Sequence, residues 1–169
     1  MHSVYDFANV FIDYFAQKGI ENDLTNTKLN KLLYLSYGLY LSQTGKELFK
    51  CEFKTHKYGV IETTIYKLYE RFVYKSIPKP LNERTNNSKL SGEEKQIVNY
   101  VIDKYADISA WVLSELINRE INVNYDYECD HKEGEVIGKE KILSYFKKYL
   151  DMQKRWELET NRILQSSGI

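Results

Sequence analysis

One long apolar stretch limits the fold of this chain more than any other feature. Between Leu32 and Leu41 nearly every residue is apolar or aromatic, and the spacing is that of a helix. A helix that is apolar on all sides must be covered on all sides, because each open face would leave hydrocarbon in water. We therefore expect this helix, capped by Thr25 or Thr27, at the centre of the fold. Gly38 in its middle predicts a place where another backbone packs closely.

Other segments repeat the helical period. Ser3 and Asp6 form the pattern of a capping box, which predicts a first helix that stops at Gly19. A second capping box, made by Ser91 and Glu94, opens another helix. We expect three helices in the middle of the chain, at residues 61–74, 91–105 and 109–119.

A long C-terminal helix is expected at residues 139–165, opening near Gly138. Residues at alternating spacings of four and three form one stripe along this helix. They are Ile142, Phe146, Tyr149, Gln153, Trp156, Thr160 and Ile163. Such a stripe docks on the parent domain, or on a partner through residues near its end such as Met152 and Trp156.

Two segments show the period of a strand instead. Phe49, Cys51 and Phe53 alternate with charged residues, and so do the apolar residues between Ile121 and Cys129. Opposite charges on facing positions favour pairing of these two segments, with both cysteines on the inner face. The sequence therefore predicts a mainly α fold with about six helices and a two- or three-stranded antiparallel sheet. We expect residues 1–169 to form a single compact domain, since this length suffices for its own core.

The net charge of the chain is zero, but the charged residues are unevenly distributed along it. The chain has 24 basic and 24 acidic residues, which argues against nucleic acid or a membrane surface as its partner. Residues 46–89 carry ten basic and five acidic side chains, whereas residues 120–140 carry two basic and seven acidic ones. These segments face each other or a partner. The fifteen tyrosines fit a protein-binding surface or a tyrosine-rich core.

The sequence shows no recognisable targeting signal. No apolar run approaches the roughly 20 residues that span a bilayer, and the first residues lack a cationic region and a cleavage site. The chain has two cysteines, which is typical of a reducing compartment rather than of a disulfide scaffold. We expect a cytoplasmic protein.

Motifs of catalysis and cofactor binding are also missing. The sequence contains no GxSxG, GxGxxG or GxxxxGK[ST], so we expect neither an enzyme nor a cofactor. The acidic run around Asp126 lacks the spacing of a calcium loop. Four residues would make a zinc site if the two strands paired, although none of their spacings resembles a zinc knuckle: Cys51, His56, Cys129 and His131. We therefore expect no metal site.

Several motifs between residues 24 and 72 occur together in one known family. Leu24, Thr25 and Asn26 lead into the KLxKLLY pattern of residues 28–34, and Leu48 and Phe49 follow. With these motifs the segment resembles the Panacea domain of SocA-like antitoxins, a family also found in prophages. The helix segment LSEL at residues 113–116 is similar to a later part of that family. The family's Tyr-Gly-Pro-Val turn appears at residues 58–61 without its proline.

The resemblance implies an antitoxin that binds a toxin encoded by an adjacent gene and blocks it, in a hetero-oligomer. Toxins of the family include alarmone-synthetase-like enzymes that modify tRNA. The alternatives are a proteolytic adaptor that delivers a toxin to a protease, or a small metal-dependent or hydrolytic enzyme. From charge and aromatic content we select as candidate partner-binding residues Lys50, Lys54, Lys57, Tyr58, Asp126, Glu128, Asp130, Met152 and Trp156.

Two roles are open for the charged candidates. The lysines would meet acidic groups of a toxin's phosphate site, and the acidic strand would fill a basic substrate channel by charge mimicry. Alternatively, the two charged faces pair only with each other.

Overall fold

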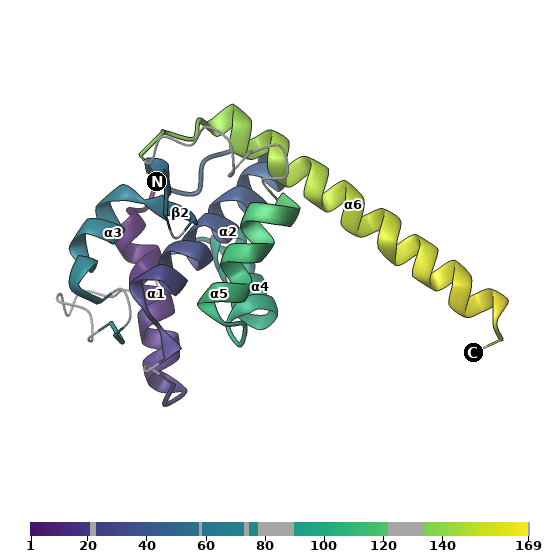
Figure 1. Cartoon of the computed structure of the whole chain (residues 1–169), viewed down its shortest axis with the longest axis horizontal. Coiled ribbons are helices and arrows are strands. Elements are labelled where there is room, and N and C mark those ends of the chain that lie inside the picture. Colours follow the sequence, from purple (N-terminus) through teal and green to yellow (C-terminus); the bar gives the residue numbers. More distant parts are fainter. Residues whose placement is uncertain (21–22, 58, 73–74, 78–89, 122–133, 169) are drawn as a thin grey trace.

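A computed structural model shows one central helix with the other helices packed around it and a hairpin at its side (Figure 1). The structure describes residues 1–20, 23–57, 59–72, 75–77, 90–121 and 134–168. In chain order the elements are α1 (Val4–Gln17), α2 (Asn26–Thr44), β1 (Phe53–His56), β2 (Gly59–Glu62), α3 (Thr63–Leu68), the 3-10 helix η2 (Glu70–Phe72), α4 (Gly92–Tyr105), α5 (Ala110–Glu115), the π-helix η4 (Leu116–Ile121) and α6 (Lys139–Ser166). The expected mainly α fold with a small antiparallel sheet is confirmed.

Helix α2 is the centre of this arrangement. Every residue from Leu29 to Leu41 is buried, including both polar and apolar positions. Helices α1, α3, α4, α5 and α6 and strand β2 all contact it. The Thr25 hydroxyl accepts a hydrogen bond from the backbone N–H of Lys28 at 3.2 Å, and Gly45 ends the helix with φ of 71°. The central position predicted from the sequence is confirmed.

The two predicted capping boxes are present. The Ser3 hydroxyl accepts from the backbone of Asp6, whose carboxylate accepts from the backbone of Ser3 at 2.9 Å, and the phenylalanine face of α1 is buried. Ser91 and Glu94 make the same reciprocal bonds at the start of α4. Each box satisfies backbone donors that a helix start leaves open, which explains why these helices begin where the sequence indicates.

The predicted helix at 109–119 is observed in two parts. Helix α5 covers Ala110–Glu115, and the π-helix η4 continues it to Ile121. Ile121 is buried at the end of η4, so its assignment to a strand was wrong. The remaining residues of that predicted strand, 122–130, lie outside the described residues.

The strand partner expected for β1 was also wrong. The strand starts at Phe53 rather than Phe49 and pairs antiparallel with β2, with Phe53 opposite Glu62 and His56 opposite Gly59. A tight hairpin closes with less loss of chain entropy than pairing with a segment far along the sequence. The second edge of β1 is occupied as well, because the backbone of Thr55 donates to Glu135 at 2.9 Å.

The predicted helix at 61–74 was wrong in its first part. Residues 60–62 belong to β2, and α3 covers only Thr63–Leu68. The reason is a cap, since the Glu62 carboxylate accepts a hydrogen bond from the backbone N–H of Ile65 at 2.8 Å while its own backbone remains extended. A short apolar run fits a strand and a helix equally well until such a cap is located.

Helix α6 begins after Gly138 and has two differently packed halves. Its first turns bury Ile142, Tyr145, Phe146 and Tyr149 against the body. From residue 151 onward the helix projects into solvent, and Figure 1 shows it extending far from the other helices. Of the helices in the described part of the chain, none combines the length and the apolar character needed to cross a membrane.

The close approach expected at Gly38 is made by an aromatic ring rather than by a backbone. The ring of Phe146 lies so near Gly38 that a Cβ at this position would overlap it. Gly38 therefore lets α6 dock on α2.

We expect Gly38→Ala to lower the free energy of unfolding by about 1–3 kcal/mol, because the added methyl group must displace the Phe146 ring. Denaturant titration measures the change. Gly92→Ala is the matched control, since a Cβ at Gly92 meets nothing within 4 Å, and should change stability little. A loss no larger than that of the control would contradict the packing role. Combining Gly38→Ala with Phe146→Leu should cost less than the sum of the two changes.

Candidate functional site

A buried polar network joins the start of α2 to the hairpin and α3. The side-chain amide of Asn30 donates to the Asn26 side-chain oxygen at 2.8 Å, and its own oxygen accepts the backbone N–H of Glu62 at 2.7 Å. Asn26 in turn donates to the backbone carbonyl of Tyr66 at 2.9 Å. Burial raises the pKa of the Glu62 carboxyl. Because buried polar groups are costly when unpaired, this network specifies how β2 and α3 sit on α2.

Lys31 continues the network in the core. Its side chain is fully buried, and its ammonium donates to the Val60 carbonyl at 2.7 Å. A Cβ at Gly59 would lie 3.0 Å from the Lys31 Nζ and 3.3 Å from the Asn118 Oδ1, and Gly59 has φ of 94°. The hairpin can approach Lys31 this closely because the position is glycine. Burial lowers the pKa of Lys31 to about 7.

Asn26 and Lys31 belong to the motifs on which the sequence resemblance rests, and Asn30 stands at the variable position of KLxKLLY. The sequence alone assigned them no role, because a polar residue in a helix gives no sign of what it will contact. Their contacts are with the protein's own backbone and side chains. They therefore fix how the hairpin and α3 sit on α2.

We expect stability to rise with pH above 7 through Lys31. An unfolded lysine titrates near 10.5, so between pH 7 and 10.5 the unfolded chain holds a proton that the folded chain has lost. The slope from this group is at most about 1.4 kcal/mol per pH unit. Lys31→Met should flatten the dependence measured by denaturant titration between pH 7 and about 9. The control Lys95→Met, at an exposed position of α4, should leave the pH dependence of stability unchanged. Equal slopes for the wild type and Lys31→Met would contradict the expectation.

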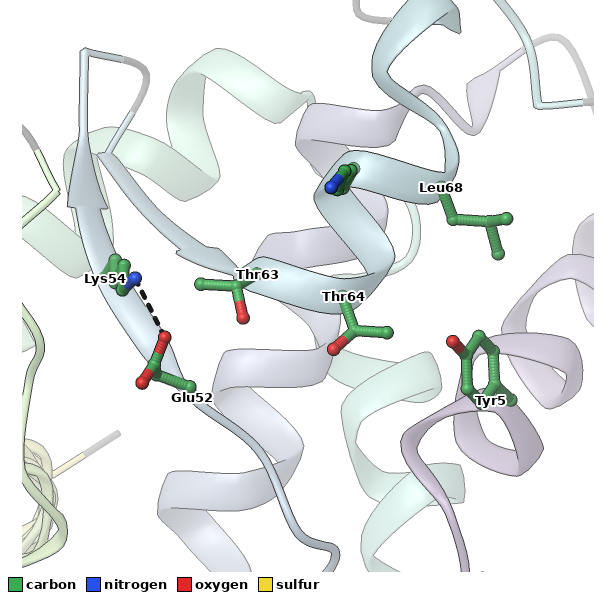
Figure 2. A pocket seen from close by; sticks show the side chains of 7 residues that line it. Tyr5, Glu52, Lys54, Thr63, Thr64 and Leu68 are labelled. Atoms are coloured by element: carbon green, nitrogen blue, oxygen red, sulfur yellow. Dashed lines mark ion pairs between the residues drawn. The ribbon is translucent and has the colours of Figure 1, made fainter.

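The surface above this network contains a hollow of about 490 Å³, which we call the lysine hollow. It is lined by Tyr5, Glu52, Lys54, Thr63, Thr64, Lys67 and Leu68. Figure 2 shows Tyr5 and Leu68 on one side and the Lys54–Glu52 pair on the other. The Lys54 ammonium lies 2.9 Å from the Glu52 carboxylate, which holds the lysine in place over the hollow.

A second depression adjoins the first. Lys50 lines it together with the first residues of the chain, and the two depressions share Tyr5 and Thr64. The combined surface thus presents three lysines and one glutamate beside a half-exposed tyrosine. Lysine ammonium groups at the border of such a surface suit contact with acidic groups of another protein.

The structure brings together some of the candidate residues and separates others. Lys50 and Lys54 share the combined surface, whereas Lys57 is exposed in the turn of the hairpin. Met152 and Trp156 lie on the projecting part of α6, on the opposite side of the molecule from α3 in Figure 1. The remaining candidates, Tyr58, Asp126, Glu128 and Asp130, lie outside the described residues.

Sequence reasoning missed Tyr5, Lys67 and the two threonines of the lysine hollow. Tyr5 is distant in sequence, so only the packing of α1 beside α3 brings it there. Thr63, Thr64 and Lys67 would have been grouped on one helix face if the break at Glu62 had been recognised.

Cys51, a candidate for nucleophilic or metal chemistry, is partly buried. Burial raises the pKa of the Cys51 thiol to about 12, so this thiol stays protonated and is a poor nucleophile or metal ligand. No cluster of three metal-ligating side chains occurs in the part of the chain that the structure describes. Of the four residues considered for zinc, Cys129 and His131 lie outside that part.

The fold is mainly helical around an apolar core that encloses a small polar network, and it exposes lysines and several aromatic residues. The family model "Antitoxin SocA-like, Panacea domain" matches residues 29–121, more than half of the chain, and the chain belongs to this family. The match runs from α2 to η4 and leaves α1 and α6 outside it. Membership supports an antitoxin role with a toxin as partner and suggests a non-enzymatic one. No curated protein and no solved structure matches the chain.

Proposed function

We propose that this protein is a neutralising antitoxin that binds a toxin encoded by an adjacent gene and covers its active or substrate site. The observation that carries the proposal is the family match over residues 29–121. The two proteins would form a hetero-oligomer in the cytoplasm, with residues 1–169 acting as one Panacea-like domain and the helix at 139–165 as its extension. No chemical step by the antitoxin is needed, because occlusion alone stops the toxin.

The lysine hollow supplies a chemical basis for occlusion. Enzymes that act on nucleotides or RNA hold metal ions with clustered carboxylates, and these metal ions bind the phosphates of the substrate. Lys54 and Lys67, together with the neighbouring Lys50, would bind such carboxylates in place of the substrate's metal ion. An alarmone-synthetase-like toxin would present a site of this kind. Complementary charge would also speed the encounter of the two proteins.

The acidic segment with Asp126, Glu128 and Asp130 fits a second contact of opposite sign. The residues that follow it, 134–137, run along β1. Residues 134–137 therefore lie beside the hairpin that also carries Lys54 and Lys57. We propose that the carboxylates of the acidic segment occupy a basic substrate channel of the toxin by charge mimicry.

Co-expression tests the proposal directly. The product of the adjacent gene should arrest bacterial growth when expressed alone, and this chain should restore growth and co-purify with it. Growth arrest that the chain does not relieve, or a harmless neighbour that does not co-purify, would overturn the proposal.

The role of the lysine hollow is tested by charge reversal. Lys54→Glu combined with Lys67→Glu should slow association with the toxin by about tenfold or more, since charge reversal replaces attraction by repulsion. The difference should shrink at high salt. Surface plasmon resonance measures the rates. Lys95→Glu on α4, which lines neither depression, is the control; equal effects of the control and the double variant would contradict a specific contact.

A further inference from the structure

The projecting end of α6 is a second exposed feature, which we call the arm and define as residues 151–166. It is about 24 Å long at the usual helical rise. All its side chains are exposed except the half-buried Gln153 and Thr160. A helix that leaves the body for four turns gains no tertiary packing there. Packing within the fold therefore does not explain the exposed apolar residues of the arm.

Of the five large apolar residues of the arm, three collect on one face, whereas Leu158 and Leu164 lie off that face. Met152 is 56% exposed, Trp156 75% and Ile163 57%. Their spacing of four and seven residues places them on the side of the helix that bears Tyr145 and Tyr149 in the docked half. The arm therefore extends into solvent the same face by which α6 packs on its own body.

We infer that the arm binds in an elongated apolar groove of the toxin, with Trp156 and Ile163 as its anchors. This inference rests on the proposed function and adds a contact separate from the lysine hollow. Helix-in-groove recognition uses apolar residues one and two turns apart, and tryptophan is the residue type most enriched at binding hot spots.

A second copy of this chain is the less suitable occupant. In a self-paired coiled coil, Gln153 and Thr160 would stand at core positions between Tyr149, Trp156 and Ile163. The arm also has about two heptads, whereas a coiled coil is sustained over roughly three or more. A groove of different shape can seat the anchors and leave the two polar residues at its rim.

Charge does not select the partner of the arm. Its three acidic and three basic side chains cancel: Asp151, Lys154, Arg155, Glu157, Glu159 and Arg162. Recognition would depend on shape and apolar contact. Since the family match ends at residue 121, the arm lies in a part of the chain that the shared domain does not include, which suits a role in choosing one particular toxin.

The test compares two faces of the same helix. Trp156→Glu combined with Ile163→Glu should weaken binding of the adjacent gene's product about 30-fold or more, as removal of a hot-spot residue does. Leu158→Glu is the matched control, because Leu158 is 70% exposed on the opposite face, and should change affinity less than about threefold. Isothermal titration calorimetry measures the affinities. Circular dichroism should show unchanged helix content, and Trp156→Ala serves as a milder second variant.

Hydrogen–deuterium exchange supplies an independent readout. Amides of residues 151–166 should exchange fast in the free protein and become protected in the wild-type complex. Unchanged affinity of the double variant, or no protection of the arm in the complex, would overturn the inference. If the wild type still rescued growth, the proposed function would remain valid. A concentration-dependent dimer of the free chain that the double variant abolishes would overturn it in favour of self-association. Failure of rescue and co-purification by the wild type would overturn both.

Discussion

Burial of α2 on every side is the constraint on which the rest of this structure depends. A helix from Leu29 to Leu41 without an exposed residue requires neighbours all around it, and five helices and a strand supply them. Where one neighbour must come very close, the helix carries Gly38, and the Phe146 ring of α6 lies against it. The course of α6, and hence the direction of the arm, follows from this contact.

The polar residues of α2 have a different task from its apolar ones. Hydrophobic packing by itself tolerates small shifts of one element over another, whereas a buried hydrogen bond has one geometry. Asn30 and Lys31 bind the backbone of β2 through Glu62 and Val60, and so set the position of the hairpin. The lysine hollow is built on this hairpin and on α3. Lys31, one of the residues that carry the resemblance to the family, thus helps to hold the hairpin beside this hollow in place.

The two surfaces proposed for toxin binding differ in physical character. The lysine hollow is concave, charged and part of the body, while the arm is convex, apolar on one face and projects from the body. Figure 1 places α3 and the arm on opposite sides of the molecule, so the two contacts share no residue. Long-range charge attraction speeds encounter, and desolvated apolar anchors slow dissociation. An antitoxin that must capture a toxin quickly and hold it would use both.

Local interactions are what the sequence by itself determined. The caps at Ser3 and Ser91 and the period of the long apolar helix depend on residues a few positions apart, so they were predicted correctly. Thr25, the cap of that helix, was one of the two that the sequence left open. The break at Glu62 was missed because a short apolar run fits a strand and a helix equally well. The partner of β1 and the grouping of Tyr5 with the lysines were not predicted either, because each depends on which distant segment lies beside it. Packing around α2 determined both of these features, and with them the lysine hollow. The sequence showed the apolar stripe of the arm, but only the tertiary structure showed that this part of α6 extends beyond the body of the protein.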